Sequence, residues 1–134
     1  MLTGGCQCGA LRYRVGADPV RVYVCHCTEC RAQSSSAFGI SVIVPPAAVI
    51  LEKGQPRIWQ RDTASGKVLA CAFCGDCGSR VWHVNEPAGA EMSIKGGSLD
   101  QPVDLSAAMH IWTISALPGV VIPDGAVQWE RDHD

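Results

Sequence analysis

The sequence lacks the features of several large classes of protein. None of its apolar runs approaches the roughly 20 residues that a membrane-spanning helix needs, so we expect no membrane association. It contains no run of lysine and arginine and has a formal net charge of −2, which argues against a nucleic-acid partner. The Cys-Cys-His-His spacing of the common DNA-binding zinc finger is also missing. No basic segment followed by an apolar one precedes the first cysteine, so we expect no signal peptide and a cytoplasmic protein.

Cysteine is moderate in amount but unusual in arrangement. The chain has 8 cysteines in 134 residues, below the roughly 8–10% of small disulfide-bonded scaffolds. Seven of them form three tight clusters, which read Cys6-Gln-Cys8, Cys25-His-Cys27-Thr-Glu-Cys30 and Cys74-Gly-Asp-Cys77. In a reducing compartment, cysteines separated by one or two residues indicate metal binding rather than disulfides.

The rest of the sequence predicts a mainly β protein with short helices. Apolar stretches bounded by glycine and proline favour strands at residues 10–15, 20–24, 38–44, 58–60, 68–73, 80–84 and 92–95. Residues 28–33 are predicted to form a short helix with Thr28 as its N-cap, and residues 46–49 to form one more helical turn. We expect a single domain over residues 1–125, followed by a short, frayed tail at residues 126–134.

The two outer clusters predict one closed metal site. Because side chains alternate along a strand, Cys6 and Cys8 are expected to project to the same side. Cys74 and Cys77 flank a tight turn whose backbone N–H groups can point at sulfur. Two pairs of thiolates make up the four ligands of a structural zinc. Buried thiols without a metal are the alternative.

The middle cluster differs because it supplies only three thiolates, from Cys25, Cys27 and Cys30. Cys30 is expected at the start of the short helix, where the helix N-terminus favours a thiolate. Three thiolates leave one position of a tetrahedral zinc free for water or substrate, which is typical of a catalytic site.

The residues outside the clusters leave alternatives open. The middle site is a second structural zinc if its fourth ligand comes from Cys71, His83 or His110. Cys71 lies three residues before Cys74, so on a strand the two side chains face opposite ways. We therefore interpret Cys71 as a buried strand cysteine. His26 is expected to point away from the metal, exposed or beside the site, and His110 to be either a core histidine or part of a pocket.

The segments around the clusters read Gly4-Gly-Cys-Gln-Cys-Gly-Ala10, Cys25-His-Cys-Thr-Glu-Cys-Arg31 and Phe73-Cys-Gly-Asp-Cys-Gly-Ser79. Supporting segments are Ser36-Ala-Phe-Gly39, Gly97-Ser-Leu-Asp100 and His110-Ile-Trp-Thr113. Together they resemble the glutathione-dependent formaldehyde-activating enzyme family, to which centromere protein V also belongs. All seven clustered cysteines match the family in order and spacing, over nearly the whole chain.

The resemblance implies a β-tent of antiparallel sheets, similar to methionine sulfoxide reductase B. It implies two zinc ions per chain: a structural zinc on Cys6, Cys8, Cys74 and Cys77, and a catalytic zinc on Cys25, Cys27 and Cys30. The implied activity is the addition of glutathione to formaldehyde, which is classed as a carbon–sulfur lyase reaction. Glutathione carries two carboxylates, and the cations near the motifs that are candidates to bind them are Arg31, Arg80 and Lys95.

Two functions from different classes follow from these patterns. The first is a zinc-dependent carbon–sulfur lyase that condenses a small thiol with formaldehyde or another small aldehyde, with His26 and His110 as candidate proton carriers. The second is a zinc-stabilised module that binds a thiol or a protein without turnover. Methionine sulfoxide reduction is a third option, but it needs a free nucleophilic cysteine, and only Cys71 is left for that role.

Overall fold

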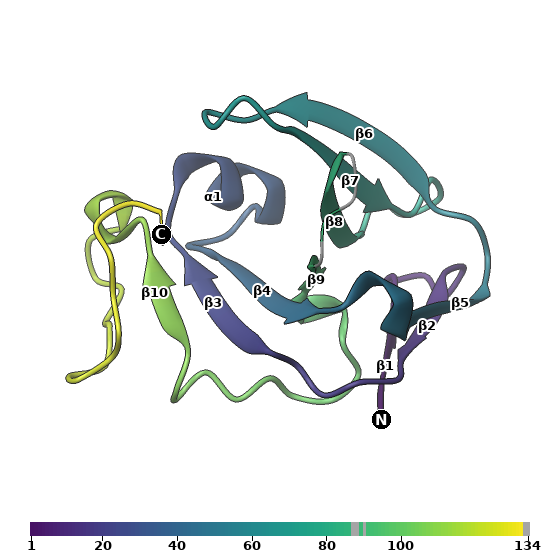
Figure 1. Ribbon diagram of the computed structural model, residues 1–134, viewed down its shortest axis with the longest axis horizontal. Helices are drawn as coiled ribbons and strands as arrows, with labels where there is room; N and C mark the ends of the chain where they lie inside the picture. Colours follow the sequence, from purple (N-terminus) through teal and green to yellow (C-terminus); the bar gives the residue numbers. More distant parts are fainter. Residues whose placement is uncertain (87–88, 90, 133–134) are drawn as a thin grey trace.

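The computed structural model describes residues 1–86, 89 and 91–132, and these form two β-sheets and one short α-helix (Figure 1). The smaller sheet has the strand order β1-β2-β5. Its strands are β1 at Leu2–Gly5, β2 at Arg12–Val15 and β5 at Val49–Lys53, and both pairs are antiparallel. The mainly β class predicted from the sequence is confirmed.

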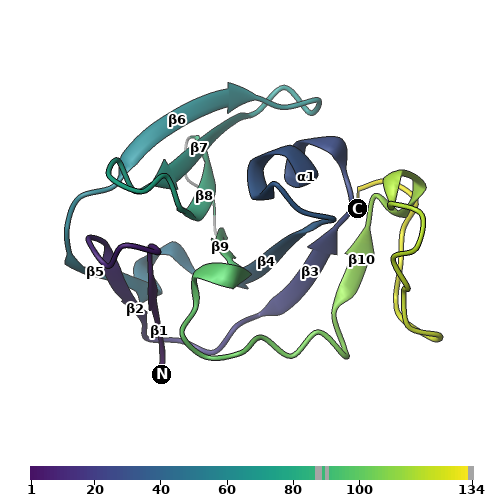
Figure 2. The ribbon, with the colours of Figure 1, turned by 180° about the vertical axis from the view of Figure 1, so that it is seen from behind.

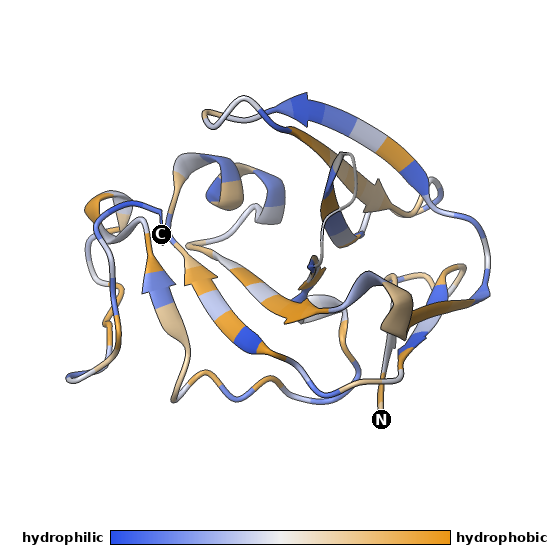
Figure 3. Cartoon of the chain, in the orientation of Figure 1, coloured by the Kyte–Doolittle hydropathy of each residue, from blue (hydrophilic) through white to orange (hydrophobic). Residues whose placement is uncertain are grey.

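The larger sheet has seven strands in the order β10-β3-β4-β9-β8-β7-β6. In chain order they are β3 at Arg21–Cys25, β4 at Gly39–Val44, β6 at Arg57–Asp62, β7 at Val68–Phe73, β8 at Arg80–Glu86, β9 at Met92–Lys95 and β10 at Met109–Ile111. The pairing is antiparallel except between β10 and β3, which are parallel. At the opposite edge β6 is mostly hydrophilic (Figure 3), which suits a strand with one unpaired side.

The hydrophobic core lies where the smaller sheet packs against the middle of the larger one. Tyr13 and Val15 of β2 pack with Val44 of β4 and Ile94 of β9, and none of the four is more than 1% exposed. The ring of Tyr13 meets the ring of Trp82 edge-on, with 5.6 Å between centroids. Burying a large apolar side chain contributes about 1.5–3 kcal/mol, so this contact between the sheets is the main apolar support of the fold.

Helix α1 spans Thr28–Ser34 and connects β3 to β4. The larger sheet curls, so that the side formed by β6, β7 and β8 reaches around towards α1 in both views of the ribbon (Figures 1 and 2). Arg61 of β6 and Glu29 of α1 are joined by an ion pair of 3.8 Å. Within the described ranges, every helix is too short or too polar to cross a membrane.

The N-cap of α1 is Cys27 rather than Thr28, so that prediction was wrong. Cys27 has an extended backbone, and its Sγ accepts a hydrogen bond from the backbone N–H of Cys30 at 3.2 Å. The sulfur thus takes the place of the side-chain oxygen that usually satisfies a free N–H at a helix start. One cysteine therefore serves both the helix and the middle cluster.

Two strands and the C-terminal tail also depart from the sequence predictions. β1 and β5 were missed because β1 ends in two glycines and β5 in two charged residues, which obscure the apolar alternation. The tail is not frayed over residues 127–131, since the N–H of His110 donates to the carbonyl of Val127 at 2.8 Å and the N–H of Trp129 to that of His110 at 2.9 Å. The tail therefore pairs along β10, while residues 133–134 of the predicted tail lie outside the described residues.

The contact between the two sheets leaves no space for a side chain at Gly4. A Cβ added there would lie 2.4 Å from the backbone oxygen of Ser98 and 2.5 Å from the hydroxyl oxygen of Tyr13. We expect Gly4→Ala to lower the free energy of unfolding by about 1–3 kcal/mol, because the added methyl group must push the backbones apart. Urea denaturation followed by tryptophan fluorescence measures the change.

Gly97→Ala is the matched control for this prediction. Nothing lies within 4 Å of a Cβ at Gly97, and its backbone is not in the left-handed region. Its denaturation midpoint should stay close to that of the wild type. Equal midpoints for Gly4→Ala and Gly97→Ala would contradict the close approach at Gly4.

Candidate functional site

The four outer cysteines form one cluster that links the two sheets. The Sγ atoms of Cys6, Cys8, Cys74 and Cys77 all lie within 4.8 Å of one another. The Sγ of Cys8 is 3.6 Å from that of Cys6 and 3.8 Å from that of Cys74. Zn–S bonds of about 2.3 Å in a tetrahedron place the sulfurs about 3.8 Å apart, so these residues fit a closed zinc site.

Two tight turns bring these thiols together. Cys6 and Cys8 lie in the loop and turn that follow β1, so strand alternation is not what places them, contrary to the sequence argument. The N–H of Leu11 donates to the Sγ of Cys6 at 3.1 Å, and the N–H of Asp76 to the Sγ of Cys74 at 3.4 Å. Burial opposes ionisation of Cys6, but the hydrogen bond from Leu11 helps to lower its pKa and so favours the thiolate, which is the form that binds a metal.

The middle cluster is assembled at the junction of β3 and α1. Cys25 ends β3, Cys27 caps the helix and Cys30 lies in its first turn. Their three Sγ atoms lie within 4.8 Å of one another. Hydrogen bonds from the thiols of Cys25 and Cys30 lower the pKa of Cys27 well below its ordinary value. The cluster thus gathers three potential thiolates in a small volume.

Among the described residues, no fourth His, Cys, Asp or Glu joins Cys25, Cys27 and Cys30. The three candidates named for that position, Cys71, His83 and His110, lie elsewhere. Cys71 is fully buried in β7, where it stands opposite His83 of β8. The interpretation of Cys71 as a buried strand cysteine is therefore confirmed.

His26 and His110 form a buried pair beside the middle cluster. The Nε2 of His26 lies 3.0 Å from the Nδ1 of His110, and the two rings are stacked with 5.3 Å between centroids. Burial lowers the pKa of both histidines. The expectation that His26 could be exposed was wrong, because β10 runs next to β3 and its His110 covers the ring.

A cavity of about 740 Å³ reaches from one cluster towards the other. Cys6 and Cys77 line it, as does Gly39 at the start of β4, whereas the cysteines of the middle cluster are not among its lining residues. A Cβ added at Gly39 would lie 3.5 Å from the Sγ of Cys30. The cavity wall is therefore in contact with the middle cluster. A volume of this size is typical of a small-molecule site.

The cavity carries more positive than negative side chains. Of the three cations named from the sequence, Arg80 and Lys95 line it and Arg31 does not. Arg12 also lines the cavity, and the sequence analysis missed it because its role depends on how β2 faces the loop after β9. The only acidic side chain among the lining residues is Asp100.

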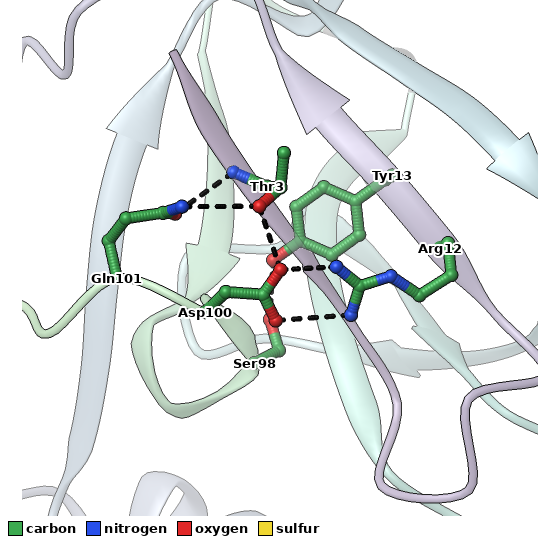
Figure 4. A network of polar contacts seen from close by, with 6 residues as sticks. All are labelled: Thr3, Arg12, Tyr13, Ser98, Asp100 and Gln101. Carbon is green, nitrogen blue, oxygen red and sulfur yellow. Dashed lines mark hydrogen bonds and ion pairs between the residues drawn. The ribbon is translucent and has the colours of Figure 1, made fainter.

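Asp100 is occupied by Arg12, in a network that fixes the Gly97-Ser-Leu-Asp100 segment against the smaller sheet (Figure 4). The two terminal nitrogens of Arg12, Nη1 and Nη2, donate to the carboxylate of Asp100, and the hydroxyl of Thr3 donates to it at 2.7 Å. The hydroxyls of Tyr13 and Ser98 are 2.6 Å apart. Arg12 therefore has its own counter-charge, whereas Arg80 and Lys95 have no ion pair among the described residues.

The fold and the clustered thiols define a β protein with two candidate metal centres next to one cavity. The sequence model of the glutathione-dependent formaldehyde-activating enzyme family matches residues 1–115, and the chain belongs to this family. The crystal structure of a Rhodobacter sphaeroides protein, a Northeast Structural Genomics target, is similar with a TM-score of 0.61 and 21% sequence identity. The match covers 81% of this chain and 98% of that one, and at this identity it shows the fold alone.

Proposed function

We propose that this protein is a zinc-dependent carbon–sulfur lyase that adds glutathione, or a similar small thiol, to formaldehyde. The observation that carries the proposal is the cluster of three thiols, without a fourth ligand among the described residues, next to a cavity of about 740 Å³. Membership of the formaldehyde-activating family supports this choice of substrates. We also propose a cytoplasmic location, where thiols stay reduced.

The two clusters have different roles in this proposal. Cys6, Cys8, Cys74 and Cys77 would hold a structural zinc, because their four thiolates complete a tetrahedron. Cys25, Cys27 and Cys30 would hold a catalytic zinc with one position free. Such a zinc can polarise a carbonyl or keep a thiol in its thiolate form.

The chain's own residues bind and orient the substrates. In the reaction, the thiol sulfur forms a bond with the carbonyl carbon, the C=O π electrons move to the oxygen, and the thiol proton ends on that oxygen. No oxidant or reductant is required. Phe38 and Ile40 contribute apolar surface to the cavity wall, while Arg80 and Lys95 provide positive charge for an anionic thiol.

The reaction can be tested by NMR exchange between formaldehyde, glutathione and their adduct, with and without the zinc-loaded protein. We expect the protein to accelerate exchange above the spontaneous rate, because holding both reactants in one site removes much of the entropic barrier. An unrelated protein that has no metal-binding site, at the same concentration, serves as the control for non-specific effects. An exchange rate equal to the spontaneous one would eliminate the lyase proposal.

The alternative is a zinc-stabilised module that binds a thiol without turnover. It is favoured by the pairing of His26 with His110, because each imidazole then faces the other instead of a substrate. Saturable binding of glutathione without accelerated exchange would support it. Methionine sulfoxide reduction is disfavoured, since Cys71 is 0% exposed and cannot meet a substrate as a nucleophile.

A further inference from the structure

Lys95 is a buried lysine whose amino group has no hydrogen-bonding partner among the residues that the structure describes. It is the last residue of β9, only 7% exposed, and it lines the cavity. Among the described residues, no group accepts a hydrogen bond from its Nζ. An unpaired ammonium group is strongly unfavourable away from water, so buried lysines are normally paired. The position therefore favours a ligand that supplies a negative partner from within the cavity.

The protein supplies little negative charge that Lys95 could use. Asp100, the acidic side chain on the cavity wall, is already bound by Arg12 and Thr3. Burial lowers the pKa of Lys95, and the sulfurs of Cys30 and Cys25 only partly oppose this effect. Lys95 itself lines the cavity, and so does Gly97, which has nothing within 4 Å of a Cβ position.

A second cation faces the same space from the adjacent strand. Arg80 begins β8, which pairs with β9, and it also lines the cavity. Its guanidinium lies over the ring of Trp59 of β6, 5.7 Å from the centroid, which is a cation–π contact. Two cations without an acidic partner in one cavity favour a ligand that carries negative charge.

We propose that Lys95 anchors an anion-binding subsite in this cavity, and that its ligand is a carboxylate of the thiol substrate. This inference rests on the proposed function for the identity of the thiol. The subsite would place the anionic end of the substrate against β9, in a cavity whose wall at Gly39 lies next to Cys30. Arg80 adds positive charge at the same wall. Lys95 is thus a specificity residue that selects anionic thiols over neutral ones.

Binding measurements test the subsite without any turnover. We would titrate the zinc-loaded protein with glutathione, and separately with glutathione diethyl ester, by isothermal titration calorimetry. For the wild type we expect the ester to bind about 10- to 100-fold more weakly, because a hydrogen bond to a charged group is lost. This comparison needs no variant, so it remains valid whatever a substitution does to folding.

Lys95→Met keeps the length of the side chain and removes its charge. We expect it to weaken glutathione binding about 10- to 100-fold while leaving the affinity for the ester unchanged. Lys95→Arg should restore part of the affinity for glutathione. Arg31→Met is the matched control, because Arg31 is a cation near the middle cluster that does not line the cavity.

Three results would overturn the subsite. The first is wild-type protein that binds glutathione and its ester equally well, or binds neither. The second is a Lys95→Met variant that loses affinity for both ligands alike. The third is a variant that loses zinc from the middle cluster, because Lys95 would then be the counter-charge of the thiolates. Formaldehyde is absent throughout, so a failed lyase reaction leaves these results interpretable on their own.

Discussion

Cys74→Ser is expected to abolish cooperative folding of this chain. Cys74 is 1% exposed, and its Sγ belongs to the cluster that joins the loop after β1 to the turn between β7 and β8. A structural zinc contributes about 10–16 kcal/mol of apparent binding free energy, which matches or exceeds the total stability of a typical domain, about 5–15 kcal/mol. The cluster also joins the two sheets, so its loss is expected to weaken the contact between them.

Circular dichroism during thermal denaturation, together with zinc analysis, measures this effect. Cys71→Ser is the matched control, because Cys71 is equally buried and lies only three residues away, but it belongs to neither cluster. We expect Cys71→Ser to retain its zinc and to unfold cooperatively, with a loss of about 1–3 kcal/mol for burying a hydroxyl group. A Cys74→Ser protein that melts like the wild type would refute a structural zinc at this cluster.

Cys27→Ser is expected to remove activity and one zinc per chain while the fold persists. Serine is a good helix N-cap, so the variant keeps an acceptor for the N–H of Cys30, which Cys27 now binds at 3.2 Å. A serine hydroxyl is a much poorer zinc ligand than a thiolate, because zinc sites draw on Cys sulfur, His nitrogen and carboxylate oxygen. The substitution therefore separates metal binding from helix capping.

Zinc content should fall from two to one per chain, and the exchange between glutathione and formaldehyde should return to the spontaneous rate. Thiol alkylation after metal removal would confirm that Cys25 and Cys30 remain intact. Thr28→Ala is the matched control, because Thr28 adjoins Cys27 and is exposed but does not cap α1. Unfolding of Cys27→Ser would instead show that the middle cluster holds the structure together.

The strand positions were largely predictable because they depend on local patterns. Residues 38–44 and 68–73 are apolar stretches next to proline or glycine, and they form β4 and β7. The short helix was also predicted from a local pattern. Its N-cap was not predicted, because capping by sulfur depends on the backbone conformation at Cys27. The pairing of the tail with β10 is a contact between distant segments, which no local pattern reveals.

The features of the candidate site also fall into local ones, which the sequence predicted, and long-range ones, which it did not. The spacing within each pair or triplet of cysteines is local, so the sequence alone identified all seven clustered thiols. The group of four brings together Cys8 and Cys74, which are 66 positions apart, and it was predicted because two pairs of thiolates complete a tetrahedron. The stacking of His26 on His110 joins residues 84 positions apart, and it depends on the parallel pairing of β10 with β3. For that reason the sequence left the environment of both histidines open.

The sequence by itself determined the family, the mainly β class and the clustered thiols, because the motifs and strand patterns that indicate them are short and local. Only the tertiary structure decided which cations face the cavity. It placed Arg12 against Asp100, left Arg31 outside the cavity, and buried Lys95 without a hydrogen-bond partner in the described part of the chain. The physical reason is that a charge becomes a binding group through its burial and its neighbours, and both are set by strands that meet only in the folded protein.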